Sequence, residues 1–61
     1  MQTVEIYTSP FCGFCVAAKR LLKSKGVEFT EYNVGMNPDK RQEMMSRANG
    51  GHTVPQIFVG E

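Results

Sequence analysis

The spacing of apolar residues changes abruptly near residue 9 of this 61-residue chain. In TVEIYT, residues 3–8, apolar and more polar side chains alternate, which is typical of a β-strand with one buried face. From Val16 to Leu22 the apolar residues recur every three or four positions with Lys and Arg between them. That spacing predicts an amphipathic helix, and Gly26 is a suitable residue to end it. The chain therefore begins with a strand, a short loop and a helix.

The same two patterns then repeat along the chain. Alternation over residues 27–34, VEFTEYNV, predicts a second strand. Asn37 is suited to cap a second helix that begins at the following proline and runs to about Arg47. QIFV, residues 56–59, predicts a short third strand. A strand, helix and strand of these lengths favour a parallel pair with a right-handed crossover, so we expect one α/β domain of order β-α-β-α-β over residues 1–61.

Charge and composition exclude some functions. The formal net charge is +1, although Lys19, Arg20, Lys23 and Lys25 lie together in a stretch without acids. We interpret them as a solvated helix face, because no basic stripe interleaves with aromatics as in nucleic-acid binding. No run approaches the about 18 apolar residues of a membrane span. The first eight residues lack the basic and apolar regions of a signal peptide, so we expect a cytoplasmic protein with reduced thiols.

Cys12 and Cys15 are the two cysteines of the chain, and three interpretations compete for them. A zinc site needs four ligands, and His52 is the one remaining candidate, so we expect no metal. A structural disulfide across so short a loop adds little constraint, and the cytosol would reduce it. Redox catalysis remains, and a C-x-x-C motif beside a strand–helix–strand pattern is typical of thioredoxin-like proteins.

The position of the motif gives the two thiols different roles. A cysteine at a helix N-terminus meets unpaired backbone N–H groups and the positive end of the helix dipole, which both favour a thiolate. Cys12 lies at or just before the first turn, so we expect it to be the exposed attacking thiol. Cys15 lies three residues later and is more covered. It can reach the sulfur of Cys12 and resolve a mixed disulfide.

A proline adds a second, distant signal. In TVP, Thr53 to Pro55, the proline comes immediately before the predicted third strand. A proline entering a sheet needs a special reason, and a cis Val54–Pro55 peptide bond in a tight turn is one. The alternative is an ordinary trans proline that begins an edge strand.

Three segments, VEIYTSPFCGFCVAAKRLLKSKGVEF, KRQEM and TVPQIF, resemble the glutaredoxin family in order and nearly in spacing, over essentially the whole chain. The resemblance implies a thioredoxin-like fold and glutathione-dependent reduction of protein disulfides and glutathione mixed disulfides. Glutathione would be a co-substrate, and no cofactor would be bound permanently. Cys12 would attack and Cys15 would resolve. Thr53, Val54 and cis-Pro55 would face the disulfide, with the backbone of Val54 pairing with the γ-glutamyl part of glutathione.

The sequence departs from the family pattern around the predicted glutathione site. Ser9 stands where the family usually has a lysine that holds the glycyl carboxylate of glutathione. A second carboxylate contact, on the second helix, falls on Arg41 or Gln42, depending on which segment fixes the alignment. Phe14 replaces a tyrosine between the cysteines, and we expect Phe14 either to contact glutathione or to pack.

Two further alternatives follow from the resemblance. Gly13 replaces the usual proline between the cysteines, and family members without that proline sometimes bind a bridging [2Fe–2S] cluster through the first cysteine of two chains, here Cys12. The family also continues after QIFV with a fourth strand and a final helix, which this chain lacks. We therefore expect apolar surface and an open strand edge at residues 56–59 and a homodimer formed through that side. The alternative for the function is an inactive glutaredoxin fragment.

Overall fold

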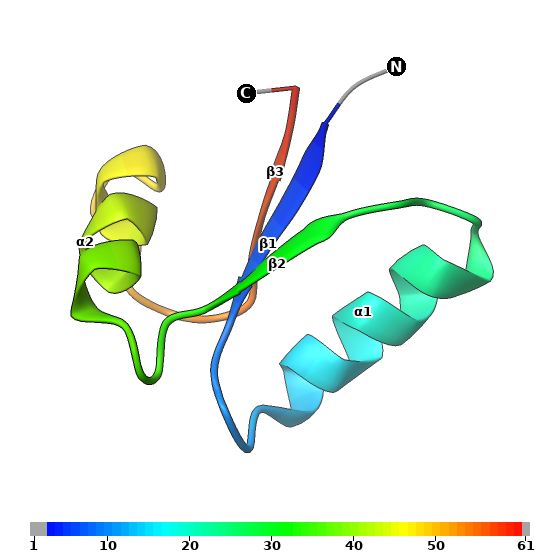
Figure 1. Ribbon diagram of the computed structural model, residues 1–61, viewed down its shortest axis with the longest axis horizontal. Coiled ribbons are helices and arrows are strands. Elements are labelled where there is room, and N and C mark those ends of the chain that lie inside the picture. Colours follow the sequence, from blue (N-terminus) through cyan, green and yellow to red (C-terminus); the bar gives the residue numbers. More distant parts are fainter. Residues whose placement is uncertain (1–2, 61) are drawn as a thin grey trace.

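The computed structural model describes residues 3–60 and has the predicted order of elements (Figure 1). The elements are β1 (Val4–Thr8), α1 (Gly13–Ser24), β2 (Thr30–Asn33), α2 (Pro38–Arg47) and β3 (Gln56–Val59). Residues 1, 2 and 61 of the predicted domain lie outside the described residues. No helix among residues 3–60 is long and apolar enough to cross a membrane.

The three strands form one mixed sheet in the order β2-β1-β3. β1 runs parallel to β2, as predicted, and Thr8 lies opposite Asn33. β1 runs antiparallel to β3, and Tyr7 lies opposite Gln56. The loops that follow β1 and β2 and the segment that precedes β3 therefore meet at one end of the sheet (Figure 1).

The two helices cover opposite faces of the sheet (Figure 1). Side-chain contacts follow the two-residue period of β1. Glu5 and Tyr7 both accept hydrogen bonds from Arg47 of α2, so they face that helix. Thr8 faces the other way and hydrogen-bonds to Glu31, which pairs with Lys19 of α1.

The core lies between the sheet and α2. Tyr7 and Met44 are fully buried and pack with Val34. The Tyr7 ring lies 5.0 Å from the Tyr32 ring and 5.6 Å, edge-on, from the Phe58 ring. Each large side chain buried in this way contributes about 1.5–3 kcal/mol to folding, so Tyr7 on the central strand β1 holds α2 to the sheet.

The α1 side of the sheet is less well covered than the apolar spacing predicted. Val16 and Leu21, which belong to the apolar spacing of α1, are 50% and 57% exposed. Ile57 and Val59 of β3 are also 44% and 53% exposed. These side chains remain open because no other element among residues 3–60 packs over them.

The second strand is shorter than predicted. Its pairing with β1 begins where Thr30 lies opposite Glu5, so residues 27–29 do not belong to the sheet. The N–H of Val27 instead donates to the carbonyl of Leu22, as part of the turn that ends α1. The apolar residues at 27–29 therefore alternate as in a strand although no neighbouring strand among residues 3–60 pairs with them.

Helix α2 begins as the sequence predicts. The Asn37 side chain accepts a hydrogen bond from the N–H of Lys40 at 3.1 Å, and Pro38 occupies the first turn. Asp39 lies in that turn and Arg47 in the last turn, and both charges suit the helix dipole. The helix ends at Arg47, as predicted.

Candidate active site

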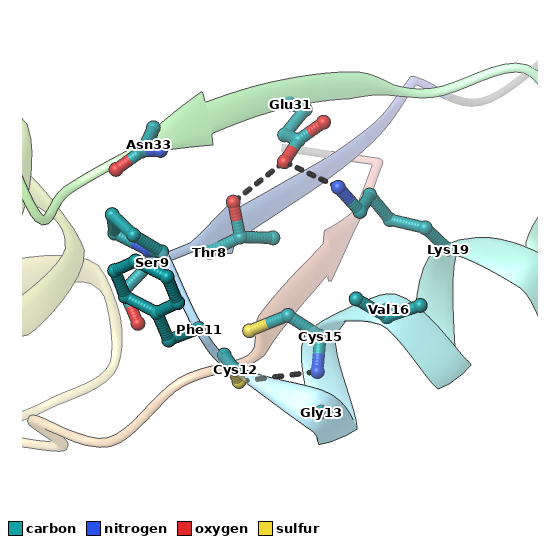
Figure 2. A pocket seen from close by; sticks show the side chains of 11 residues that line it. Thr8, Ser9, Phe11, Cys12, Gly13, Cys15, Val16, Lys19, Glu31 and Asn33 are labelled. Carbon is teal, nitrogen blue, oxygen red and sulfur yellow. Dashed lines mark hydrogen bonds and ion pairs between the residues drawn. The ribbon is translucent and has the colours of Figure 1, made fainter.

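The two cysteines lie at the start of α1 (Figure 2). Cys12 is the N-cap residue, with an extended backbone, and its sulfur accepts a hydrogen bond from the N–H of Cys15 at 3.1 Å. The first turn contains no acidic side chain. Free N–H groups at a helix N-terminus favour negative charge, so the position predicted for Cys12 is confirmed and suits a thiolate.

Cys15 is the covered member of the pair and is 2% exposed. Both cysteines are free thiols. Burial raises the pKa of the Cys15 thiol, and its hydrogen bond with Cys12 raises it further. The backbone N–H of Ser9 and the charge of Lys19 act in the opposite direction without reversing the shift. Cys15 is therefore protonated at neutral pH and lies beside the sulfur of Cys12.

Two phenylalanines flank Cys12 and point into solvent. Phe11, in the loop before Cys12, is fully exposed and has a φ of 58°, in the left-handed region. Phe14, in the first turn of α1, is 81% exposed. Neither ring packs against the core, so of the two alternatives for Phe14 the packed one is wrong. Both rings are available to a molecule that approaches Cys12.

The loop that carries Cys12 rests on the loop after β2. A Cβ atom added at Gly35 would overlap the Cδ atom of Pro10, and it would lie 3.2 Å from Oδ1 of Asn33. Gly35 was not among the residues predicted for this site. A glycine in a turn is common, and its spacing gives no sign that Pro10, 25 positions earlier, packs against it.

A hollow of about 470 Å³ opens beside the two thiols on the α1 side of the sheet (Figure 2). Thr8, Cys15, Lys19 and Glu31 contribute to its lining. Thr8 Oγ1 donates to Glu31 Oε2 at 2.7 Å, and Lys19 Nζ pairs with the same oxygen at 2.9 Å. The hydrogen bonds from Thr8 and Lys19 lower the pKa of Glu31. Glu31 is therefore ionised at neutral pH.

Sequence reasoning missed this group of polar side chains. It assigned Lys19 to a solvated helix face and gave Thr8 and Glu31 no role. One signal was present in the sequence, because Lys19 follows Cys15 by four positions and so lies on the same face of the helix.

The segment Thr53–Pro55 lies at the same end of the sheet as the cysteines. Because Tyr7 lies opposite Gln56, Pro55 comes next to Thr8 where the chain leaves β1. The Val54–Pro55 peptide bond is cis, as predicted. Val54 packs against the Tyr7 cluster, whereas Thr53 is exposed.

The remaining predicted residues lie on the surface. Arg41 and Gln42 are both exposed on α2, whose first turn lies at the same end of the sheet (Figure 1). His52 is exposed in the segment before Thr53. Within residues 3–60, no three His, Cys, Asp or Glu side chains gather in a way that could hold a metal ion.

Comparison with known proteins identifies relatives for nearly the whole chain. A family model described as Glutaredoxin matches residues 4–61. A probable glutaredoxin of Synechocystis sp. is 53% identical over 58 residues, which are 95% of this chain and 53% of that protein. Glutaredoxin 3 of Escherichia coli K12 is 52% identical over 59 residues, which are 97% of this chain and 70% of that protein.

A solved structure agrees with these matches. The solution structure of glutaredoxin from Brucella melitensis aligns with a TM-score of 0.73 and 48% sequence identity, and covers 92% of this chain and 60% of that one. The fold is thus the thioredoxin-like α/β fold that the sequence resemblance implied. The chain spans about half to two thirds of the length of several of these relatives.

Proposed function

This chain belongs to the glutaredoxin family, and from that premise we propose that it is a thiol–disulfide oxidoreductase that uses glutathione as co-substrate. Its substrates are protein disulfides and mixed disulfides of proteins with glutathione. The observation that carries the proposal is the pair of free thiols at the start of α1. Cys12 caps the helix, and the buried Cys15 lies against it.

The proposed reaction begins at Cys12. Its thiolate attacks one sulfur of the substrate disulfide, a new S–S bond forms, and the other substrate sulfur leaves with the electron pair and takes a proton from water. When the substrate is a protein disulfide, Cys15 then loses its proton and attacks the sulfur of Cys12, which releases the second substrate sulfur. Two glutathione molecules reduce the resulting Cys12–Cys15 disulfide and become glutathione disulfide.

The proposed glutathione site lies around the exposed side of Cys12. The backbone of Val54, between Thr53 and Pro55, would pair with the γ-glutamyl part of glutathione. Arg41 or Gln42 would bind a carboxylate of glutathione, since both side chains are exposed and carry N–H donors. The ring of Phe14 would cover the side of the bound tripeptide.

We also propose that the protein acts in the cytoplasm. The reducing glutathione pool there keeps both thiols free and supplies the co-substrate. Its partners would then be glutathione and cytoplasmic proteins that carry disulfide or glutathionylated cysteines. Recognition of nucleic acid is not part of the proposal, because the net charge of the chain is +1.

Turnover of two substrates tests the proposal. One substrate is a peptide glutathionylated on a single cysteine and the other is a peptide with an internal disulfide, each supplied with excess glutathione. Cys12→Ser should abolish turnover of both, because the attacking sulfur is lost. Cys15→Ser should retain turnover of the glutathionylated peptide and lose most turnover of the internal disulfide, which needs the resolving thiol.

The opposite pattern would overturn the assignment of roles. If Cys15→Ser abolished both reactions while Cys12→Ser retained one, Cys15 would be the attacking thiol. Replacing glutathione with an equal concentration of 2-mercaptoethanol tests the co-substrate, and turnover should fall at least about tenfold if binding groups recognise glutathione. Equal turnover with both thiols would contradict glutathione dependence.

A further inference from the structure

Cys15 lines the hollow beside α1 together with a defined set of other groups. Cys12 lies at the start of the same helix, and Lys19 lies about one turn beyond Cys15. The end of β1 contributes Thr8, and Ser9 follows it in the loop. β2 contributes Glu31. Lys19 is the one cation among the residues that line this hollow.

Contacts with the sheet hold Lys19 in place. Its ammonium pairs with Glu31 Oε2 at 2.9 Å, and the Lys19 side chain is 29% exposed. The same oxygen accepts the hydroxyl of Thr8 at 2.7 Å, and Thr8 is 1% exposed. Figure 2 shows the Lys19 and Glu31 side chains reaching toward each other across the hollow. Thr8 therefore fixes Glu31, and Glu31 holds the Lys19 ammonium at the hollow.

The neighbouring cation Arg20 lies differently. It contributes to two other hollows on the outer side of α1 and does not line the hollow beside Cys15. Arg20 is exposed on the same helix and is the next residue after Lys19. It is therefore a matched control, with the same charge and nearly the same position but without the contact to Glu31.

The resolving step of the proposed function requires a thiolate on a buried sulfur. Burial raises the pKa of Cys15, whereas Lys19 and the N–H of Ser9 lower it. Once Cys12 has formed a mixed disulfide, its sulfur carries no charge and no longer opposes ionisation of Cys15. Lys19 is then the charged side chain at the hollow that favours the thiolate of Cys15.

We propose that Lys19, held by Glu31 and Thr8, is a positioning residue for the resolving step and stabilises the thiolate of Cys15 when it attacks the mixed disulfide on Cys12. This inference rests on the proposed function and adds a role for residues that the proposed function does not use. Glu31 and Thr8 act through Lys19.

The resolving step exchanges one S–S bond for another. The S–H proton of Cys15 passes to water in the open hollow, and the Cys15 thiolate attacks the sulfur of Cys12. The Cys12–Cys15 bond forms as the bond from Cys12 to the substrate sulfur breaks. The substrate sulfur leaves with the electron pair and takes a proton from water. The two thiols of the chain are oxidised, and the substrate disulfide is reduced by two electrons.

Reaction of the reduced chain with 4,4′-dithiodipyridine separates the two steps. Attack by Cys12 releases one 4-thiopyridone, and resolution by Cys15 releases a second. The probe and its product carry no charge near neutral pH, so they do not themselves bind the lysine. Stopped-flow absorbance across a range of pH gives the rate of each release for the unchanged chain and for Lys19→Gln, Lys19→Arg, Glu31→Gln and Arg20→Gln.

We expect Lys19→Gln to slow the second release about three- to tenfold at pH 7 and to move the midpoint of its pH profile upward by about half to one unit. Its first release should stay within about twofold of the unchanged chain. Lys19→Arg should restore most of the second rate, because it keeps the charge. Glu31→Gln should give a smaller change in the same direction, and Arg20→Gln should change neither release.

Two outcomes would overturn these claims separately. If the unchanged chain gave no first release that depends on Cys12, the proposed function would fail, and this inference with it. If the first release were normal but the second release of Lys19→Gln matched that of Arg20→Gln at every pH, the inference alone would fail. A normal first release also shows that each variant keeps the start of α1 folded.

Discussion

Phe11 has a left-handed backbone conformation immediately before Cys12, with a φ of 58°. This conformation costs a residue with a Cβ atom about 1–2 kcal/mol, and glycine adopts it freely. The exposed ring of Phe11 loses no packing when it is removed. We predict that Phe11→Gly raises the free energy of unfolding by about 0.5–1 kcal/mol, as measured by urea denaturation.

Phe14→Gly is the matched control for this change. Phe14 is also exposed, but it lies inside α1, where glycine is destabilising by about 0.5–1 kcal/mol. The two substitutions remove the same ring and should shift stability in opposite directions. A loss of stability in Phe11→Gly equal to that in Phe14→Gly would show that the backbone at position 11 carries no such cost.

At the level of single elements, Asn37 caps the N-terminus of α2. Its side chain accepts the N–H of Lys40, one of the N–H groups that have no partner within the helix. We predict that Asn37→Ala lowers the free energy of unfolding by about 1 kcal/mol, because this hydrogen bond is lost. Ser46→Ala, an exposed change near the other end of α2, should stay within about 0.5 kcal/mol of the unchanged chain. Equal effects of the two changes in denaturation experiments would contradict the role of the cap.

Elements that depend on local signals could be predicted from the sequence. The cap at Asn37, the end of α2 at Arg47 and the strand at residues 56–59 follow from neighbouring residues, and the structure confirms each. The length of β2 could not be predicted, because it depends on where β1 supplies a partner. Val27 alternates correctly with its neighbours but lies before the paired region.

The candidate site also combines positions that local sequence predicts with contacts that only the folded chain creates. The positions of Cys12 and Cys15 at a helix start are a local property, and the sequence predicted them. The meeting of Thr8, Glu31 and Lys19 depends on the pairing between β1 and β2 and on how α1 lies across them, so residues 12 and 23 positions apart come together only in the folded chain. The charge pattern suggested a solvated helix face for Lys19, and the structure adds an exposed ion pair with Glu31.

At the scale of the whole molecule, carboxylates tie the sheet to both helices. A hydrogen bond from Arg47 lowers the pKa of Glu5 below its ordinary value of 4.5, with a further hydrogen bond from Tyr32. A hydrogen bond from Tyr7 does the same for Glu43. A carboxyl group with a lowered pKa in the folded state stabilises the fold above its unfolded pKa, and this contribution is lost as the pH falls through the folded value.

We therefore predict that the thermal unfolding midpoint, at one fixed chain concentration, changes little between pH 7 and pH 5 and falls as the pH drops below about 4.5. Glu5→Gln should unfold at a lower temperature than the unchanged chain at pH 7, because the ion pair with Arg47 is lost. The difference between the two midpoints should shrink as the pH falls. A difference that stayed constant down to pH 3 would contradict the link between Glu5 and acid sensitivity.

The outer side of β3 gives a second prediction at this scale. Among residues 3–60, no strand pairs with the outer edge of β3, and Ile57 and Val59 are about half exposed. Exposed apolar strands at a sheet edge pair readily with other chains. We predict that this 61-residue chain self-associates through β3 at micromolar concentration, as measured by sedimentation velocity.

Substitutions at the edge test which surface is responsible. Ile57→Lys should shift the chain toward the monomer, because a charge on an edge strand opposes pairing. Met36→Lys is the matched control, since Met36 is 85% exposed in the loop after β2. It should leave the sedimentation profile unchanged. A monomeric unchanged chain, or equal effects of both substitutions, would contradict association through β3.

Because Pro10 packs directly against Gly35, the loop after β2 limits where the loop that leads to Cys12 can lie. A methyl group at position 35 has no room unless the loop that leads to Cys12 moves away. A methyl group at Gly13, between the cysteines, meets nothing within 4 Å. In a saturation library selected for Cys12 reactivity, position 35 should therefore be strongly depleted of every residue but glycine, although it lies outside the motif. Position 13, inside the motif, should accept many residues. Mutational tolerance around this site would follow free volume more closely than distance along the chain from the cysteines.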